Sequence, residues 1–470
     1  MNNDLSHTPE LKLDYKRTFY IGLAFFSILM IWQLYNHYCP IFLNHLLGQK
    51  YQDSNSLLYI VGVIMAADNL FAIFMLPIFG ALSDKTKTRW GRRMPYIIGG
   101  MLASVILFPF IAVMFILNSL VGVIVMMGLI LVVMNIYRNP AVALMPDITP
   151  KPLRSKANGI INFAGYLGAI FAGGLAIFFS VGEYGEPSWN PTNPLIAFLI
   201  GSVLMLVVMV LLFVKIKENK LVEETKEEMA LGELLSQTHA KIEENKPLSP
   251  IDKRNMIILL FSVLFWFVSF NAVETFNSLF CKEILGNDKI NGIVVIVLTV
   301  SSIVTFLASM NLAFKIGRKN CILLGLGLII LGYIGIIIML ATKGAFKDSV
   351  TSVSVTPAFT VLFLVMIAIC GVGWALINVN SYPIMVEMSS RNNIGKYTGY
   401  YYTFSMTAQS ITPIVVGLIM SFNSRGLKLL YPYSLLTMVI ALVIFIFFKE
   451  NKKAVAQIKR GFESLAREDD

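Results

Sequence analysis

Three ionisable side chains interrupt long apolar stretches of this sequence and are the first candidates for chemistry. They are Arg138, Asp68 and Glu274, each flanked along the chain by residues suited to lipid. A charge held inside a membrane costs at least a few kcal/mol, so a charged residue there either has a function or pairs with another group. These side chains offer hydrogen bonding to a polar cargo and transfer of a proton.

Arg138 stays protonated at any accessible pH, so it can bind but cannot carry a proton. Its planar guanidinium group donates paired hydrogen bonds to hydroxyls or to a carboxylate. One interpretation is therefore a binding group that faces a central cavity. The other is a buried tie to a neighbouring helix, because no carboxylate in its own apolar run can neutralise it.

Asp68 and Glu274 can change protonation where Arg138 cannot. Burial favours the neutral form of a carboxylic acid, so a carboxyl group in a partly dry cavity can load a proton from one side and release it to the other. We expect proton coupling at one or both of them. The alternative is a structural carboxylate that pairs with Arg138 or accepts hydrogen bonds from its helix neighbours.

Amide and aromatic side chains in the apolar runs are the remaining binding candidates. A sugar presents hydroxyls around apolar C–H faces, so it suits amides, which both donate and accept hydrogen bonds, and a flat aromatic ring. The same side chains also suit contacts between helices. The candidates are Asn36, Asn69, Asn162, Tyr166, Asn271, Trp374, Asn378 and Asn380.

Composition places these residues in a membrane protein. The 470 residues are 56% hydrophobic and only 14% charged, which is too apolar for a soluble protein of this size. The net charge of +10 comes from cations at segment ends and predicts no nucleic-acid partner. The cysteines have no metal-ligand spacing, so we expect them to be buried and predict no metal or cofactor.

Hydrophobic windows predict an all-α membrane protein of about twelve transmembrane helices in two pseudo-symmetric six-helix bundles. We expect an N-terminal bundle (1–216), a polar, partly helical and solvated linker (217–254), a C-terminal bundle (255–450) and a cytoplasmic tail (451–470). The spans are expected near residues 19–43, 58–82, 95–117, 120–146, 157–181, 195–216, 256–281, 290–314, 321–341, 357–386, 397–422 and 430–448.

The halves carry matching residues, which is typical of parallel repeats that build a central site between them. Phe26, Ser27 and Asn36 match Phe261, Ser262 and Asn271, while Asp147, Lys156 and Gly159 match Glu387, Lys396 and Gly399. Charges at helix ends can sit in the polar interface at low cost. We therefore assign Asp147, Lys156, Glu387 and Lys396 to a gating or structural network rather than to substrate binding.

The stretch from Gly80 to Arg93 connects the second and third predicted spans and reads Gly-Ala-Leu-Ser-Asp-Lys-Thr-Lys-Thr-Arg-Trp-Gly-Arg-Arg. Gly80 would let two helices approach closely, and the cations would hold the connection on the cytoplasmic side. Gly-x-x-x-Asp followed by Arg-x-Gly-Arg-Arg resembles the loop signature of the major facilitator superfamily. We assign Asp84, Arg92 and Arg93 to the gate.

Further motifs narrow this resemblance. Arg-Trp-Gly-Arg-Arg-Met-Pro, the run Tyr137 to Asp147, the run Ile377 to Pro383 and the run Trp266 to Glu274 are similar to the sucrose-transporter branch and its glycoside-pentoside-hexuronide relatives. The resemblance implies a monomeric, multi-pass plasma-membrane symporter, not an enzyme, that carries a disaccharide or other glycoside by alternating access.

The second span departs from the melibiose-type symporters, in which two aspartates help to hold sodium. Here those positions are Ala72 and Leu76, which favours protons as the coupling ion. Two alternatives stay open: a proton-driven exporter of amphiphilic compounds on the same fold, and a membrane sensor that binds a sugar without moving it. A broad aromatic and methionine-lined cavity would favour export.

The distribution of cations predicts topology. With twelve spans, about 30 of the 38 Lys and Arg residues fall on the side of the linker and both termini, which places that side in the cytoplasm. Arg138 lies within a span, and seven cations fall on the opposite side: Lys50, Lys282, Lys289, Lys343, Lys347, Arg425 and Lys428. Cysteines introduced at Ser249 and Ser424 should therefore react with an impermeant thiol reagent from opposite faces. Reaction of both from outside would contradict this topology.

Overall fold

A computed structural model describes residues 11–51, 57–238, 250–347, 350, 352–388, 394–423 and 426–449. The predicted tail and the positions Ser249 and Ser424 lie outside the described residues. Within the described part, twelve helices are long and apolar enough to cross a membrane. The prediction of twelve spans is therefore confirmed, with most helix ends within a few residues of the expected positions.

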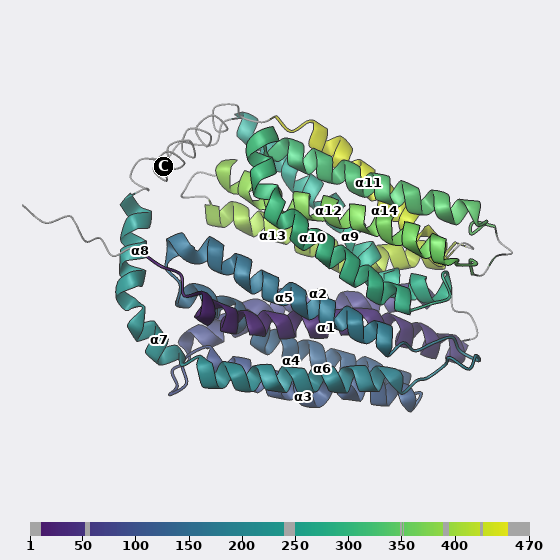
Figure 1. Cartoon of the computed structure of the whole chain (residues 1–470), viewed down its shortest axis with the longest axis horizontal. Helices are drawn as coiled ribbons and strands as arrows, with labels where there is room; N and C mark the ends of the chain where they lie inside the picture. The colour runs from purple at the N-terminus through teal and green to yellow at the C-terminus, as the bar shows by residue number, and fades with distance from the viewer. Residues whose placement is uncertain are drawn as a thin grey trace, which may run out of the picture.

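The first six spans form one group in the lower part of Figure 1, and the last six form a second group above them. The first group comprises α1 (Tyr15–Tyr51), α2 (Leu58–Lys85), α3 (Met94–Ile116), α4 (Leu120–Asp147), α5 (Arg154–Phe178) and α6 (Asn193–Lys215). The second comprises α9 (Pro250–Glu283), α10 (Lys289–Ile316), α11 (Arg318–Thr342), α12 (Pro357–Met388), α13 (Ile394–Ser421) and α14 (Leu430–Ile446).

Helices pack in the same pattern within each group, which is the expected pseudo-symmetry. In the first group α1 packs on α5 and α6, α4 packs on α2 and α3, and α3 packs on α6. In the second group α9 packs on α13 and α14, α12 packs on α10 and α11, and α11 packs on α14. The contacts between the groups are also symmetric, because α2 meets α13 while α5 meets α10.

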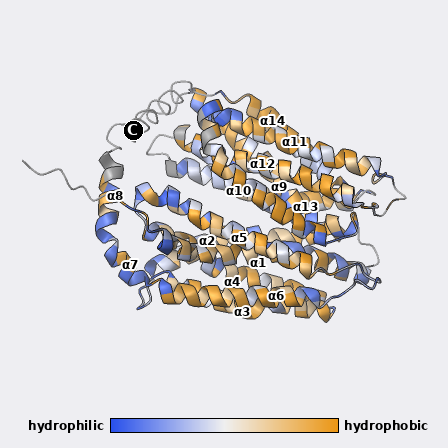
Figure 2. Ribbon diagram, in the orientation of Figure 1, coloured by the Kyte–Doolittle hydropathy of each residue, from blue (hydrophilic) through white to orange (hydrophobic). Residues whose placement is uncertain are grey.

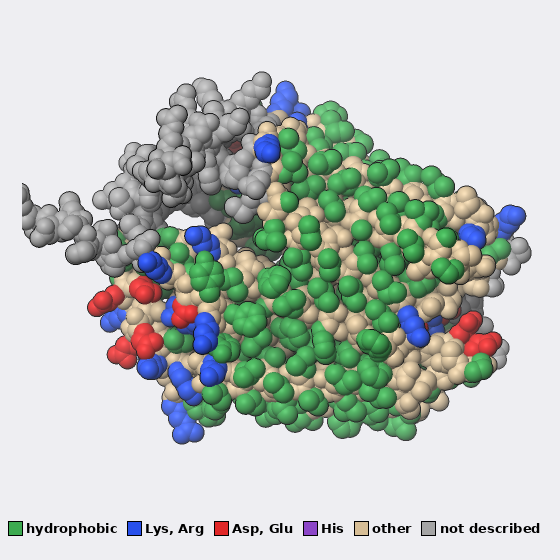
Figure 3. Space-filling model, viewed as in Figure 1, with side chains coloured by type: hydrophobic (Ala, Val, Ile, Leu, Met, Phe, Trp, Pro, Cys, Tyr) green, Lys and Arg blue, Asp and Glu red, His purple; other side chains and the backbone are tan. Residues whose placement is uncertain are grey.

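Apolar side chains cover the middle of the molecule, and charged side chains gather at its ends. Figure 2 shows helices that are hydrophobic along most of their length, and Figure 3 shows Lys, Arg, Asp and Glu concentrated at the two ends of the visible face. Large apolar side chains such as Val203 (61% exposed) on α6 face outward. This surface matches the hydrocarbon of a bilayer, which satisfies no backbone polar group and so requires complete helices.

The connection between the two groups carries two further helices, α7 (Glu218–Glu224) and α8 (Lys226–Thr238). Both lie at the left end of the molecule in Figure 1, which we call the linker end, and the opposite end is the far end. The linker is partly helical, as predicted. It is not simply solvated, however, because Glu218 is only 1% exposed and α8 packs against the 3₁₀ helix η2 (Lys151–Leu153).

At the far end the two groups are in backbone contact. A Cβ atom added to Gly62 of α2 would lie 2.0 Å from the carbonyl oxygen of Pro413 in α13. On the opposite side of the molecule, a Cβ atom on Gly173 of α5 would lie 2.8 Å from the carbonyl oxygen of Gly292 in α10. Small residues at both contacts let the helix backbones approach closely and close this end.

The same helix pairs separate toward the linker end. A hollow of about 420 Å³ lies between α5 and α10, lined among others by Lys156, Phe163 and Leu307. On α2, Phe74 is 63% and Ile78 is 57% exposed. The two groups are therefore closed against each other at the far end and splayed at the linker end.

Gly62→Ala should disfavour closure of the far end, because its methyl group would collide with the Pro413 carbonyl and separation of the groups relieves that collision. Spin labels at the exposed far-end residues Glu186 and Lys343 should report a longer distance in this variant. The native cysteines do not compete for labels, since all four are free and buried. Gly99→Ala is the matched control, because its Cβ atom would meet nothing within 4 Å. An unchanged distance in Gly62→Ala would contradict this account.

Candidate functional site

A central cavity of about 220 Å³ lies between the two groups of helices. Among the described residues, its lining contains one cation, one carboxylate and several amides within an otherwise apolar membrane domain. The side chains come from α1, α2 and α4 on one side and from α9 and α13 on the other. They are Ile28, Leu29, Trp32, Gln33, Asn36, Met65, Asn69, Arg138, Asn271, Glu274, Thr275 and Gln409.

The packing of α4 directs Arg138 into this cavity. The preceding residue, Tyr137, is fully buried, and its Cβ atom would lie 2.7 Å from a Cβ added to Gly100 of α3. Neighbouring residues of a helix point about 100° apart, so burying Tyr137 against α3 turns Arg138 inward. There its guanidinium carbon lies 5.2 Å from the centre of the Trp32 ring, which is a cation–π distance.

Helix α9 contributes the acidic side of the cavity. Trp266 and Phe276 are fully buried and fix the rotation of this helix. The Asn271 amide donates a hydrogen bond of 2.7 Å to the Phe267 carbonyl oxygen, and Asn271 lines the cavity. Glu274 lies one turn further along the same face and lines the cavity.

One contact across the cavity joins the groups directly. The Asn69 amide on α2 donates to the backbone carbonyl oxygen of Gln409 on α13, at 3.3 Å. Because these helices belong to different groups, the bond must change when the groups move relative to each other. Asn69 thus both lines the cavity and touches the element that would rearrange.

The structure brings five of the predicted binding and coupling residues together in the central cavity: Asn36, Asn69, Arg138, Asn271 and Glu274. Asp68 lies on α2 beside Asn69, but its side chain lies outside the described part of the structure. Clustering of these residues favours the binding interpretation of Arg138 over that of a structural tie.

The other predicted binding residues lie elsewhere. Asn162 and Tyr166 line the hollow between α5 and α10. Trp374 stacks on Phe270, with ring centres 3.7 Å apart. The Asn378 amide donates to the Trp374 carbonyl oxygen at 2.9 Å, and Asn380 is fully buried with its amide 3.3 Å from the Ser309 hydroxyl.

The cavity lining also contains Trp32, Thr275 and Gln409, which sequence analysis did not predict. Trp32 lies one turn before Asn36 on α1, so helical spacing from a chosen candidate could have found it. Thr275 follows Glu274 directly. Gln409 is an uncharged polar residue in an apolar run, a pattern that is also typical of simple contacts between helices.

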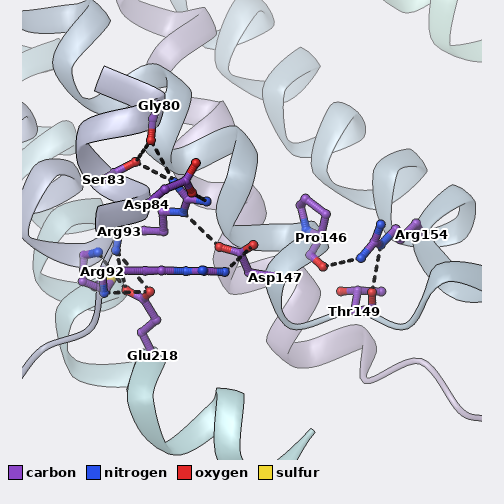
Figure 4. A network of polar contacts seen from close by, with 11 residues as sticks. Gly80, Ser83, Asp84, Arg92, Arg93, Pro146, Asp147, Thr149, Arg154 and Glu218 are labelled. Atoms are coloured by element: carbon purple, nitrogen blue, oxygen red, sulfur yellow. Dashed lines mark hydrogen bonds and ion pairs between the residues drawn. The ribbon is translucent and has the colours of Figure 1, made fainter. Parts of the chain in front are cut away.

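A second polar cluster, which we call the linker-end network, consists of Asp84, Arg92, Arg93 and Asp147 (Figure 4). Arg93 Nε donates to Asp147 at 2.9 Å, and its guanidinium also pairs with Asp84. Arg92 reaches the other oxygen of Asp147 at 2.7 Å. Sequence analysis placed all four at the gate, and the structure brings them into direct contact.

Arg93 is the centre of the linker-end network. Its side chain is 6% exposed, whereas that of Asp84 is 57% exposed. Burial by itself would lower the pKa of the Arg93 guanidinium, but hydrogen bonds and charge from Asp147 and Asp84 hold that pKa above its ordinary value. Arg93 is also 2.5 Å from the Ser83 hydroxyl. It therefore ties the end of α2 to the end of α4 as a permanent cation.

Gly80 supports this arrangement. A Cβ atom at Gly80 of α2 would lie 2.4 Å from the Asn139 side chain of α4, so the predicted close approach is confirmed. Among the other gating candidates, Lys156 lines the hollow between α5 and α10, and the Lys396 ammonium lies 5.8 Å from the Tyr400 ring centre. The side chain of Glu387 lies outside the described part of the structure.

The described residues contain no group of three or more His, Cys, Asp or Glu side chains that could hold a metal ion. Arg138, Glu274 and the amides of the central cavity instead suit hydrogen bonding to an organic molecule.

Comparison with known proteins identifies the family. The model of the Major Facilitator Superfamily matches residues 19–355. The chain belongs to this superfamily. It is thus a multi-pass membrane transporter protein. An uncharacterized symporter, sll1374, of Synechocystis sp. is 42% identical over 43 residues, which are 9% of this chain and 8% of that protein.

Solved structures show the same fold at low sequence identity. A bacterial homologue of the iron transporter ferroportin has a TM-score of 0.64 at 14% identity, covering 94% of this chain and 100% of that one. The xylose transporter XylE from E. coli gives 0.63 at 15% identity, covering 93% and 99%. The nucleoside transporter NupG gives 0.59 at 15% identity, covering 92% and 100%. Superfamily members with different cargoes therefore share this architecture.

Asp147→Asn should lower thermal stability far more than Asp84→Asn. Breaking a mostly buried pair leaves a buried charge and costs on the order of 3 kcal/mol, whereas an exposed pair contributes about 0–1 kcal/mol. Unfolding of the detergent-solubilised protein measures the difference. Glu224→Gln is the control, because Glu224 pairs with Lys220 in solvent. Equal losses in the two aspartate variants would contradict the conclusion that the buried Asp147, rather than the exposed Asp84, is the main partner of Arg93.

Proposed function

We propose that this transporter is a proton-coupled sugar symporter of the cell membrane. The observation that carries the proposal is the central cavity, in which Arg138 and a set of amides lie opposite Glu274 at the boundary between the two groups of helices. A cation that cannot lose its proton and an acid that can gain one supply the two functions of a symporter. The sugar is a disaccharide or another glycoside, and the protein works as a monomer.

Sugar binding is assigned to the Arg138 side of the cavity. The guanidinium group donates to hydroxyls, the amides of Asn36, Asn69 and Asn271 donate and accept, and the Trp32 ring offers an apolar face. Because Trp32 already lies against Arg138, ring and cation form one preorganised surface. Such a surface loses little conformational entropy when cargo binds.

Proton coupling is assigned to Glu274, with Asp68 as the other candidate. Glu274 lies in the cavity that holds Arg138, so its charge affects cargo bound there. Protonation of Glu274 removes a negative charge from a region of low dielectric constant. This changes the free energies of the cargo-free and cargo-bound forms of the transporter by different amounts. Ala72 and Leu76 replace the aspartates expected of sodium coupling, so we favour protons.

Alternating access is supported by a difference in packing between the two ends of the molecule. The groups touch through Gly62 and Gly173 at the far end and separate at the linker end. Cations concentrate at the linker end, so we place this end and both termini in the cytoplasm. Asp84, Arg92, Arg93 and Asp147, together with Lys156, Glu387 and Lys396 at the helix ends, are proposed to bias the inner opening.

One observation favours export of an amphiphilic compound as the second candidate. The hollow between α5 and α10 is larger than the central cavity, and its lining is mainly apolar and aromatic, including Phe163 and Tyr166. An amphiphile would prefer that surface to a cavity with two charged groups. The two proposals therefore predict different binding sites.

The decisive experiment separates binding from coupling in proteoliposomes. Arg138→Ala should abolish binding of the transported sugar, because the cavity loses its strongest donor. Glu274→Gln should keep exchange of labelled sugar across the membrane but lose accumulation driven by a pH gradient, because its amide cannot take up a proton. Asp68→Asn tests the second carboxylate in the same way.

Glu186→Gln is the matched control, since Glu186 is exposed at the far end and outside the cavity. Accumulation of sugar by both Glu274→Gln and Asp68→Asn under a pH gradient alone would rule out both residues as the essential proton carrier. Export of an amphiphile that depends on Phe163 but not on Arg138 would favour the second candidate.

A further inference from the structure

Glu218, the first residue of α7, is almost completely buried although it belongs to a polar linker. It is 1% exposed. Its carboxylate accepts hydrogen bonds from three consecutive backbone amides, those of Arg92, Arg93 and Met94, at distances between 2.9 and 3.1 Å. A linker residue thus binds directly to the connection between α2 and α3.

These three amides lie at the start of α3, where Arg93 is the cap residue and Met94 is the first residue of the helix. The first amides of a helix have no partner within the helix, and Arg93 at the cap position provides no side-chain acceptor. A carboxylate is the strongest acceptor for them, and it also balances the positive end of the helix dipole. Glu218 therefore caps α3 although more than 120 residues of sequence separate the two.

The connection is shaped to receive this carboxylate. Gly91 has a φ angle of +119°, and a Cβ atom there would lie 2.1 Å from a Glu218 carboxylate oxygen. Glycine is thus required for both the backbone conformation and the close approach. The neighbouring Asn219 strengthens the contact, because its amide donates to the carbonyl oxygens of Thr88 and Arg89 at 3.0 and 3.1 Å.

The residues held by Glu218 are the cations of the linker-end network. Figure 4 shows the Glu218 carboxylate at the backbone of Arg92 and Arg93, while their side chains extend away from it to Asp147 and Asp84. Backbone and side chain of each arginine are thus fixed by different acids. The position of Arg93 depends on both.

We propose that Glu218 is a positioning residue of the gate formed by the linker-end network. Helix α7 then takes part in gating and does more than connect the two groups of helices. By fixing the backbone of Arg92 and Arg93, Glu218 sets the geometry in which their guanidinium groups engage Asp147 and Asp84. A second contact extends the attachment along the linker, since Lys151 of η2 pairs with Glu233 of α8 at 2.5 Å. The linker helices should therefore move with the N-terminal group.

This inference rests on the gating role proposed for the linker-end network, but not on the identity of the cargo or of the coupling ion. Its first test therefore needs no substrate. Spin labels at Ile78 on α2 and Tyr400 on α13, which are exposed near the linker end, report the opening between the groups. The buried native cysteines leave the labels specific for the introduced sites.

Glu218→Gln is the informative change, because it keeps the shape of the side chain. A glutamine offers one oxygen to the amides and turns its own N–H groups toward the remaining donors, so at least one bond is lost. The distance distribution between the labels should shift relative to the wild type. Glu223→Gln, an exposed neighbour on the same helix, should leave it unchanged.

A double-mutant cycle with Asp147→Asn distinguishes positioning from general structural support. If Glu218 acts through Arg92 and Arg93, Asp147→Asn removes the interaction that Glu218 organises, and the two effects should be far from additive. Once a cargo is known, Glu218→Gln should lower turnover by about tenfold while leaving the dissociation constant of the cargo unchanged.

Two results would overturn the proposal: a label distribution in Glu218→Gln identical to that of Glu223→Gln, or fully additive effects with Asp147→Asn. Asn219→Ala keeps the test possible if Glu218→Gln fails to fold, because it loosens the same contact without exposing the helix end. It should shift the distribution in the same direction by a smaller amount. If the wild-type protein transports no sugar while the label distribution shifts as expected in Glu218→Gln, the proposed cargo is contradicted and this inference stays intact.

Discussion

The constraint on which the structure depends is that hydrocarbon satisfies no charge and no backbone polar group. Complete helices solve the problem for the backbone, and a cavity between them solves it for Arg138 and Glu274. Because both side chains must face inward, the helices that carry them are fixed in rotation. The need to shelter polar groups from lipid and the construction of a polar cavity between the helices are thus one physical requirement.

Repetition of one six-helix packing pattern places the cavity at the boundary between the two groups. Each group packs internally by the same contacts, and the pairs α2 with α13 and α5 with α10 form the boundary between them. Glycines at the far end bring these helices into backbone contact, whereas bulky residues such as Phe163 and Leu307 line the hollow toward the linker end. The distribution of small and large residues along the same helices therefore permits closure at one end and opening at the other.

At the linker end, charged side chains fix the relative positions of helix ends that apolar packing alone does not fix. Arg93 joins α2, α3 and α4 through Asp84 and Asp147, while Glu218 fixes the backbone from which Arg93 extends. Every charged group in this cluster except Asp84 and Arg92 is mostly buried, so its loss leaves an unpaired partner rather than a solvated one. The cluster therefore holds the ends of α2, α3 and α4 together through contacts that depend on one another.

The sequence by itself determined the twelve spans and the close approach at Gly80, because apolar length and local motifs act over few residues. It also identified Arg138, Glu274 and the four charged residues of the linker-end network as candidate functional residues. Only the tertiary structure decided that Asn271 lines the cavity while Asn380 packs against Ser309, since that depends on helix rotation set by distant contacts. The burial of Glu218 against Gly91 could not be predicted from the sequence either. The residues around Glu218 in the charged linker do not indicate which distant backbone amides its carboxylate will bind.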